Sequence, residues 1–280
     1  MLSHFMRQYY GLMNDIWVLG QEVEVGEWQS QDIRDRPEMI SRELTHVTVK
    51  MHISSTEGGL IHEVQPNMPW AEDHFRERVS GQPLNPPPSE EWWPFRVRGN
   101  QDHKEVEGSK FSHTYPERFW PKMANVGETR PNGRQVFVPH NGIRYEYGDL
   151  IDVLNMLQKN PLTRQAYLPI WFPEDTGAVD GQRVPCTLGY HFLIRRGKLD
   201  IVYNMRSCDL LRHFRDDVYM AGRLAQWVCS RLTGVQPGDL VMHISSLHFF
   251  RGDYPMVRGE LIKRGYDPDA GEEPVYGAAV

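Results

Sequence analysis

Cys186 is the residue in this chain with the clearest chemical potential. It lies in Arg-Val-Pro-Cys-Thr, directly before an expected strand. A lone cysteine is more often a small buried hydrophobe than a nucleophile. Here, however, Pro185 fixes the backbone before the thiol, and Arg183 favours the thiolate form. Cys208 and Cys229 lack such a setting, and Cys229 falls inside a helical pattern, which predicts a core position. Cys186 is therefore the candidate nucleophile.

Arg206 and Ser207 follow directly after a second expected strand. A guanidinium group and a hydroxyl at a strand end can bind one phosphate dianion, although a surface ion pair is the simpler interpretation of two residues alone. Arg164 has the same two interpretations. The formal net charge of −6 does not attract polyanions, so a local arginine pocket indicates a small nucleotide and no nucleic-acid strand.

The composition predicts one large domain over residues 1–280, with 40% of the residues apolar. No run reaches the ~18 apolar residues of a transmembrane helix, and no membrane association is expected. The N-terminal 20 residues read as an amphipathic helix and not as a signal peptide. Three cysteines are too few for a disulfide framework, which favours a cytoplasmic location.

The elements that must position these residues follow from periodicity. Residues 44–51 have the β-branched content of a strand, and 147–159 repeat leucines at helical spacing. The Pro-rich stretch 82–145 predicts a long surface excursion. Residues 189–205 predict a hairpin that turns at Arg-Arg-Gly-Lys, and 216–233 a buried helix stopped by Gly234. After these come a turn at 236–239 and a strand at 240–250, which gives an α+β fold with a mostly antiparallel or mixed sheet flanked by helices.

Read together, the stretch 159–250 resembles the thymidylate synthase family in order and spacing. The family has a nucleophilic cysteine followed 20 residues later by the arginine of an Arg-Ser-x-Asp motif, and here Arg206 follows Cys186 by 20. The matching segments are Asn-Pro-Leu-Thr-Arg at 160–164, Val-Pro-Cys at 184–186, Arg-Ser-Cys-Asp at 206–209, Val-Gln-Pro-Gly-Asp at 235–239, and His248. Before residue 110 the resemblance is much thinner. It implies a thymidylate-synthase-like fold with sheets packed at a dimer interface.

The resemblance implies covalent chemistry on a pyrimidine nucleotide. Cys186 would add to C6 of the ring, so that C5 attacks the methylene of 5,10-methylenetetrahydrofolate, with no metal expected. Arg206 and Ser207 would bind the substrate phosphate. Arg164 would reach that phosphate from the partner subunit, which implies an obligate homodimer.

Further roles are carried over in the same way. Asp209 resembles the carboxylate that faces the folate pterin. Tyr115 resembles the tyrosine that assists proton removal from C5, and His248 the histidine that holds the sugar hydroxyl.

Two N-terminal roles keep alternatives. Arg36 resembles the mobile-loop phosphate arginine, with Arg34 as the alternative. Glu72 is the candidate catalytic glutamate, with Glu77 also possible because the interval to Gly81 is longer than the family's. Otherwise both carboxylates are solvated helix charges.

The sequence also departs from the family pattern. Thr187 stands where the family has His, Ser246 where it has Asp, and Phe250 where it has a sugar-binding Tyr. The segment 210–217 replaces the usual Gly-x-Pro-Phe-Asn, and Asp217 stands at its base-reading Asn. Phe250 lacks one hydroxyl for the sugar pocket, so ribose and deoxyribose both remain possible.

Asp217 is the departure with a direct chemical meaning. An Asn amide matches the N3–H donor and O4 acceptor of uracil, whereas a carboxylate opposite O4 places two acceptors together. A carboxylate accepts from N4–H of cytosine and, with a shared proton, also satisfies N3. The alternative is that Asp217 or Asp216 is only a helix N-terminal charge.

A thymidylate-synthase-like site that reads cytosine resembles the cytidylate 5-hydroxymethylases. This resemblance implies an enzyme that acts on CMP or dCMP, with water trapping the C5 methylene. Enzymes of this type serve phage DNA modification or nucleoside-antibiotic pathways. A cytidylate C5-methyltransferase, a dUMP-type thymidylate synthase, and a non-catalytic nucleotide- or RNA-binding family member are the alternatives.

Overall fold

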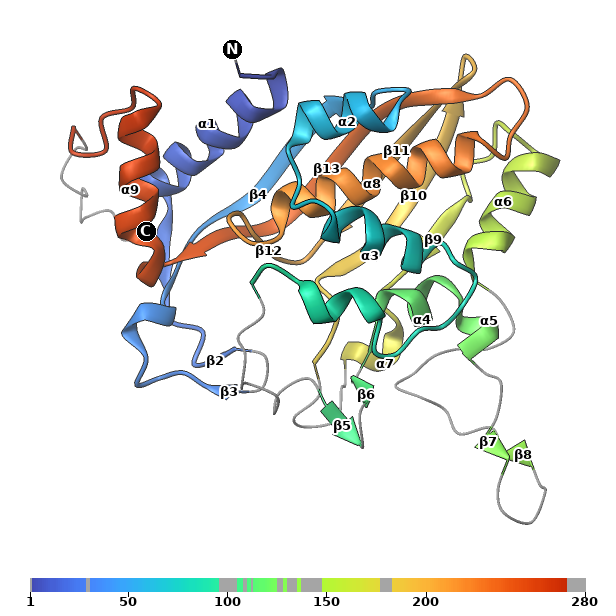
Figure 1. Cartoon of the computed structure of the whole chain (residues 1–280), viewed down its shortest axis with the longest axis horizontal. Coiled ribbons are helices and arrows are strands. Elements are labelled where there is room, and N and C mark those ends of the chain that lie inside the picture. The colour runs from blue at the N-terminus through green and yellow to red at the C-terminus, as the bar shows by residue number, and fades with distance from the viewer. Residues whose placement is uncertain are drawn as a thin grey trace, which may run out of the picture.

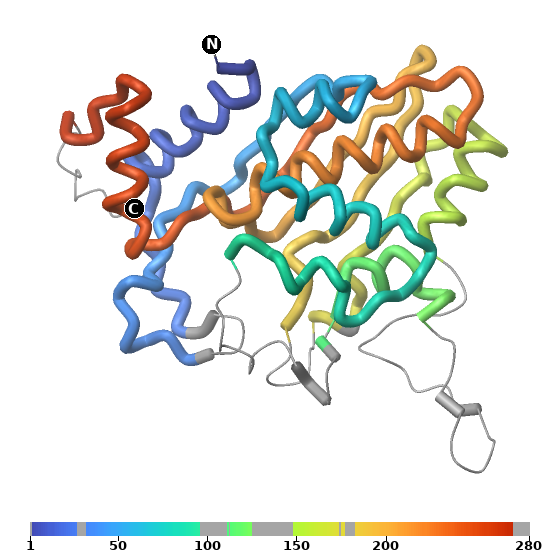
Figure 2. Tube along the Cα trace, in the orientation of Figure 1, coloured from blue at the N-terminus to red at the C-terminus, as the bar shows by residue number. Residues whose placement is uncertain are grey.

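A seven-stranded mixed sheet organises the chain, with helices packed against it (Figure 1). The computed structural model describes residues 2–28, 31–95, 105–107, 110–111, 113–124, 128–129, 135–136, 148–176 and 183–270, and Figure 2 traces their path. The strand order is β1 (Gln21–Val23), β4 (Ser41–His52), β13 (Gln236–Phe250), β11 (Lys198–Met205), β10 (Thr187–Arg195) and β9 (Tyr167–Pro169), with β12 (Cys208–Asp209) paired to β13. The predicted α+β class is confirmed.

The predicted hairpin is present as β10 and β11. Arg196 and Gly197 form its two-residue turn with φ of +52° and +73°, the left-handed backbone that matches the twist of paired strands. From β11 the chain crosses over through β12 and α8 (Phe214–Cys229) and returns as β13, parallel to β11. A parallel return requires such a crossover, and it places α8 on one face of the sheet.

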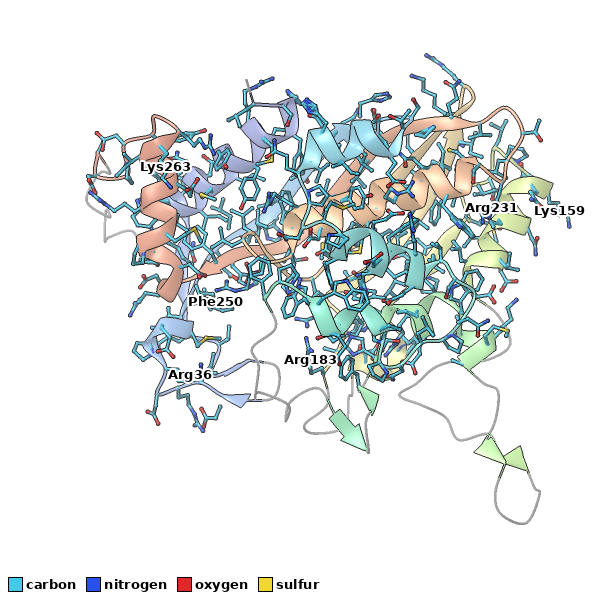
Figure 3. All side chains as sticks on the ribbon, viewed as in Figure 1. Arg36, Lys159, Arg183, Arg231, Phe250 and Lys263 are labelled. Atoms are coloured by element: carbon cyan, nitrogen blue, oxygen red, sulfur yellow. The ribbon has the colours of Figure 1, made fainter. Side chains whose placement is uncertain are left out.

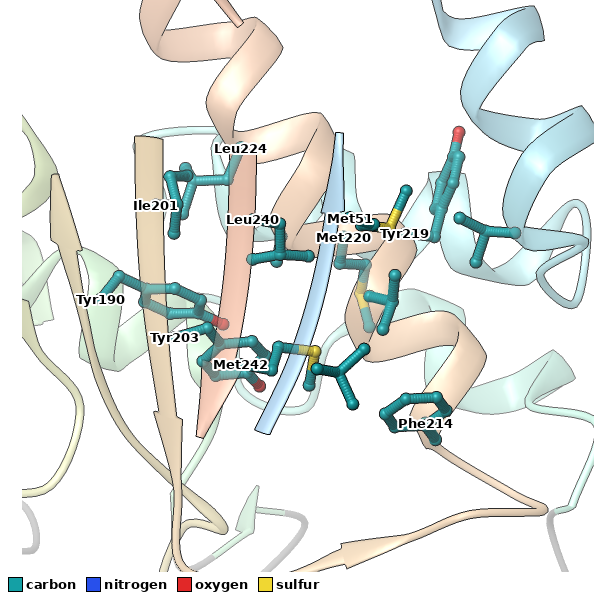
Figure 4. Close-up of a cluster of buried hydrophobic side chains, with 14 of the residues drawn as sticks. Met51, Tyr190, Ile201, Tyr203, Phe214, Tyr219, Met220, Leu224, Leu240 and Met242 are labelled. Atoms are coloured by element: carbon teal, nitrogen blue, oxygen red, sulfur yellow. The ribbon is translucent and has the colours of Figure 1, made fainter. Parts of the chain in front are cut away.

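Helices α2 (Glu57–Val64), α3 (Trp70–Arg78) and α8 lie on that face of the sheet (Figure 1). Figure 4 shows the core between α8 and the strands. Each fully buried apolar side chain there contributes about 1.5–3 kcal/mol. The core includes Tyr190, Ile201, Tyr203, Phe214, Met220, Leu224, Leu240 and Met242. This packing fixes α8 against the strands that carry the predicted site residues.

Three predicted boundaries are corrected. The helix predicted at 216–233 is α8, which ends at Cys229 instead of residue 233, and Gly234 lies beyond it with φ of +73°. Residues 236–239 are not a turn, because Gln236 and Pro237 already pair with Lys198 and Leu199 as the start of β13. The predicted excursion at 82–145 contains the 3-10 helix Pro88–Trp92, α4 (Tyr115–Phe119) and α5 (Pro121–Ala124), and much of its remainder lies outside the described residues.

Helix α4 is fixed by a buried ion pair. Arg118 donates from Nη1 and Nη2 to the two carboxylate oxygens of Asp175, each at 2.9 Å. Both side chains are almost fully buried, and Asp175 lies in α7 (Pro173–Thr176), which precedes the Cys186 segment along the chain. A bidentate buried pair restricts geometry more than a surface pair does. It therefore holds Tyr115, the first residue of α4, at a defined position.

The remaining elements lie around this centre. None of the helices described combines the length and apolar character needed to cross a membrane. The elements not yet named are α1 (His4–Leu19), β2 (Glu27–Trp28), β3 (Gln31–Asp32), the 3-10 helix Pro37–Met39, β5 (Glu105–Glu107), β6 (Lys110–Phe111), β7 (Glu128–Thr129), β8 (Gln135–Val136), α6 (Leu150–Lys159), the 3-10 helix Arg251–Asp253 and α9 (Tyr254–Lys263).

Candidate active site

Cys186 lies directly before β10 and beside the two residues predicted to bind phosphate. The Ser207 hydroxyl donates to its Sγ at 3.6 Å, and Arg206 Nη2 lies 3.8 Å from the same sulfur. Arg206 also donates from Nε to the Pro185 carbonyl at 2.9 Å and from Nη2 to that of Val184 at 3.2 Å. The guanidinium group thus holds the nucleophile's loop while facing the thiol. The structure brings this predicted set together.

Thr187 and two tyrosines form a hydroxyl cluster next to the thiol. The fully buried Thr187 hydroxyl lies 2.8 Å from Tyr203 Oη and donates to Tyr115 Oη at 3.1 Å. Burial, followed by the negative charges of Cys186 and Asp217, raises the pKa of Tyr115. Tyr115 is therefore a neutral phenol at physiological pH, and its hydroxyl lies close to the nucleophile.

The two aspartates in the first turn of α8 have different surroundings. Asp216 accepts hydrogen bonds from the backbone and side-chain nitrogens of Asn67 at 2.7 and 2.8 Å. Asp217 instead accepts from the Cys208 thiol at 3.8 Å, on the side of the hydroxyl cluster. Burial raises the pKa of Asp217 to about 7, against the lowering effect of Arg78. Asp216 is the structural carboxylate, and Asp217 faces the candidate site.

Arg78, the last residue of α3, is part of the site although its sequence context did not single it out. Its guanidinium carbon lies 4.0 Å from the centroid of the Tyr115 ring, and the residue is only 3% exposed. Its side chain makes no hydrogen bond or ion pair with any described residue, and Nε is buried without a partner. Ala71, His74, Phe75 and Arg78 share the buried face of α3, so an arginine on that face was the available signal.

Neither predicted catalytic glutamate is brought to this cluster. Glu72 accepts hydrogen bonds from Tyr219, Arg223 and Arg76 at 2.8–2.9 Å. Burial raises the pKa of Glu72, but these hydrogen bonds together outweigh that effect and lower it. Glu77 accepts from the Ser89 backbone nitrogen at 2.6 Å and contacts His74. Glu72 is 4% exposed, so its interpretation as a solvated charge is wrong. The contacts of both carboxylates tie α3 to its neighbours.

Asp209 and His248 are paired opposite each other in β12 and β13. Asp209 Oδ1 accepts from the backbone nitrogens of Leu211 and Arg212, and its Oδ2 accepts from Arg212 Nη1 at 3.0 Å. Burial lowers the pKa of His248, so the imidazole is neutral at physiological pH. The Asp209 carboxylate is thus largely occupied by groups of its own chain.

A cavity of about 390 Å³ lies next to this pair. Aromatic and thioether side chains line it together with two arginines and two carboxylates, and Arg212 is ion-paired with Asp253 at 2.7 Å. The cavity therefore combines flat apolar surface with charges of both signs. No group of three or more His, Cys, Asp or Glu side chains is placed to hold a metal ion among the described residues. The lining residues are Tyr9, Tyr10, Met13, Phe95, Leu211, Arg212, Arg215, Asp253, Met256 and Glu260.

The remaining predicted phosphate ligands lie on the surface. Arg36 is ion-paired with Glu38 at 3.1 Å, and Figure 3 shows it well apart from Arg183, near the Cys186 loop. Arg34 pairs with Asp32. Arg164 is exposed beyond the end of α6, and its side chain makes no hydrogen bond to the described part of the chain. Within one chain, these arginines are not brought to Cys186.

Comparison with known proteins identifies relatives. The family model described as thymidylate synthase matches residues 107–270, more than half of the chain. A "Putative thymidylate synthase" of Methanosarcina barkeri is 32% identical over 110 residues, 39% of this chain and 49% of the relative. A "Putative thymidylate synthase" of Methanosarcina acetivorans is 31% identical over 105 residues, which cover 38% of this chain and 47% of the relative. A "Thymidylate synthase" of Rhodopseudomonas palustris is 25% identical over 117 residues, 41% and 38%. The chain spans about half or less of the length of these relatives.

The raised pKa of Asp217 predicts a pH-dependent stability. Between pH 3.8 and about 7 the folded chain keeps a proton that the unfolded chain releases, so stability falls as pH rises through this window. We expect Asp217→Asn to increase the free energy of unfolding, relative to wild type, more at pH 8 than at pH 5, by at most about 1.4 kcal/mol per pH unit.

Urea titrations at pH 5 and 8 measure this difference. Asp269→Asn is the control, because that exposed carboxylate, paired with Arg258, has a lowered pKa and does not titrate in the window. The same difference at both pH values for Asp217→Asn would contradict the prediction.

Proposed function

The chain belongs to the thymidylate synthase family, and from its site residues we propose that it is a folate-dependent one-carbon transferase acting at C5 of CMP or dCMP. The observation that carries the choice of base is Asp217, a buried carboxyl group that faces the Cys186 cluster. The proposed catalytic unit is a single domain over residues 1–280. The proposed product carries a hydroxymethyl group at C5.

In the proposed reaction the Cys186 thiolate adds to C6, and C5 then takes up the methylene that the folate supplies. Arg206 and Ser207, next to the thiol, bind the phosphate of the same nucleotide. The Tyr115 hydroxyl, held by Thr187, assists removal of the C5 proton. Loss of that proton expels tetrahydrofolate and leaves an exocyclic methylene at C5. Water adds to this methylene, and the Cys186 thiolate then leaves C6, which restores the C5–C6 double bond.

The ionised form of Asp217 supports cytosine as the base. With a pKa of about 7, the carboxyl group can share a proton with N3 of cytosine while it accepts from N4–H. The carboxylate form opposite O4 of uracil would place two acceptors together in a buried site. His248, neutral and next to Asp209, is the proposed ligand of the sugar hydroxyl.

The cavity near Asp209 supports binding of 5,10-methylenetetrahydrofolate. Its aromatic lining suits a flat ring system, and Arg215, which forms no ion pair with a described residue, suits an anionic tail. The hydrogen bonds to Asp209 place it at this cavity through Arg212. Its proposed contact with the pterin therefore requires either a free lone pair or a shift of Arg212.

A homodimer is proposed from two observations. The sheet face opposite α8 carries exposed Thr48, Lys50 and His243, with no described helix over them. Arg164 is exposed and forms no side-chain hydrogen bond within its own described chain. The uncovered sheet face fits a contact with a second copy, and the exposed Arg164 fits an arginine that completes the phosphate site of that copy. Arg36, in the loop before β4, is a further proposed phosphate ligand.

The proposed activity predicts the product. Incubation with methylenetetrahydrofolate is expected to convert CMP or dCMP, faster than dUMP, to a product heavier by CH₂O, without dihydrofolate. Product mass and absorbance measure this, with Cys186→Ser as the inactive control. A methyl product with dihydrofolate would identify a methyltransferase, and faster conversion of dUMP a uridylate enzyme. No turnover and no covalent adduct would identify a non-catalytic nucleotide-binding protein.

The base assignment predicts a change of preference in one variant. Asp217→Asn is expected to lower kcat/KM for the cytidylate by at least about tenfold and to raise that for dUMP, because the amide supplies a donor to O4. Asp216→Asn is the matched control and should keep the wild-type preference, since Asp216 contacts Asn67. An unchanged ratio of the two kcat/KM values in Asp217→Asn would contradict the role of Asp217.

The proposed dimer predicts complementation between inactive variants. Arg164→Ala and Cys186→Ser are each expected to have little activity. Subunits refolded together should recover about a quarter of the wild-type activity, because half of the dimers then contain one intact site. If mixing restores no activity while the variants still exchange subunits, Arg164 does not act across the interface.

A further inference from the structure

Arg78 is a buried positive charge for which the described chain provides no anionic partner in contact. The residue is only 3% exposed, and its Nε has no hydrogen bond. Its guanidinium plane lies over Tyr115, 4.0 Å from the ring centroid. A desolvated cation without a hydrogen-bonding partner is costly, so its presence here indicates that something else completes the contact.

The surroundings of Arg78 limit what that group is. Its backbone carbonyl accepts a hydrogen bond from Trp120 Nε1 at 2.8 Å, which fixes the end of α3. Tyr115 connects to Thr187, the residue after Cys186, and Asp217 feels the Arg78 charge more strongly than any other. The guanidinium group therefore lies near both the base-reading carboxyl group and Tyr115, which contacts the residue next to the nucleophile. Under the proposed function, the pyrimidine ring binds between the nucleophile and that carboxyl group.

We infer that Arg78 is a catalytic residue that contacts the pyrimidine ring and stabilises the negative charge which Cys186 addition creates there. This inference rests on the proposed covalent function, but not on which base is bound. It assigns to a cation at the end of α3 a part of the catalysis for which the sequence offered only Glu72 or Glu77. Both of those carboxylates have other partners.

The electron balance of the step shows why a cation is needed. The Cys186 thiolate contributes the pair that forms the Sγ–C6 bond, and the C5–C6 π bond breaks. Its electron pair moves onto C5 and is delocalised through C4 to N3 in cytosine, or to O4 in uracil. The negative charge of the thiolate is thereby transferred to the ring, and no proton moves. A guanidinium group within contact of the ring stabilises that charge more than the uncharged ground state.

The test compares formation of the covalent adduct in matched variants. Arg78→Met retains an unbranched apolar side chain over Tyr115 but removes the charge, and Arg78→Lys retains the charge. Arg231→Met is the control, because Arg231 also covers an aromatic ring, that of Trp227 at 3.5 Å, but is exposed at the end of α8. Each protein is mixed with the 5-fluoro analogues of CMP, dCMP and dUMP plus methylenetetrahydrofolate. Adduct mass over time and nucleotide affinity are measured.

We expect Arg78→Met to slow adduct formation by about 100-fold or more, with nucleotide affinity changed less than about tenfold. Arg78→Lys should recover part of the rate, and Arg231→Met should match wild type. Adduct formation by Arg78→Met within about threefold of wild type would overturn the inference and leave the proposed function intact. Equal losses in the Met and Lys variants with a lowered melting temperature would indicate a structural role and also overturn it. A wild-type protein that forms an adduct only with the uracil analogue would overturn the cytidylate assignment alone, and one that forms none would overturn both.

Discussion

The packing of α8 against β11 and β13 is the interaction on which the site depends. A parallel return from β11 to β13 requires a crossover, and the apolar face of α8 fixes that crossover on the sheet. The first turn of the helix is thereby pressed against the end of β11. Asp217 in that turn loses its hydration, which is why its pKa rises to about 7. The fold itself supplies a carboxyl group that holds or releases a proton near neutral pH.

The charged side chains near this carboxyl group lie on different sides of the site. Arg206 lies on the side of the thiol, Arg78 on the side of the Tyr115 ring, and Asp216 accepts hydrogen bonds from Asn67. The negative charge that the proposed chemistry brings, first on the thiolate and then on the ring, thus meets a cation at each stage. Buried cations are stabilised best when such a charge is present, which couples the electrostatics of Arg78 to the proposed reaction.

Much of the fold could be predicted from local sequence, because the hairpin, α8 and β4 have strong periodicity and clear turn residues. The hairpin also explains the contact between Cys186 and Arg206, since a tight hairpin returns the chain to its starting end. The environment of Glu72 could not be predicted, because its partner Arg223 is 151 residues away. Arg78 was missed for a related reason. Its position on the buried face of a short helix does not reveal its contact with Tyr115, which is distant in the sequence. The predicted end of α8 and start of β13 were wrong, because pairing between distant strands overrides the local turn signals of Pro and Gly.

Thr187 connects these features to the fate of the C5 intermediate. A histidine after the nucleophile would add a group that titrates near neutral pH, whereas the Thr187 hydroxyl only relays hydrogen bonds between Tyr115 and Tyr203. Tyr115 and Tyr203 both have raised pKa values through burial and stay neutral. Asp217, with its pKa raised to about 7 by burial, can instead gain or lose a proton near neutral pH. A site built of neutral hydroxyls around one titrating carboxyl group is well suited to order a water molecule next to the ring. That arrangement is a physical reason to favour water over hydride as the group that quenches the C5 methylene.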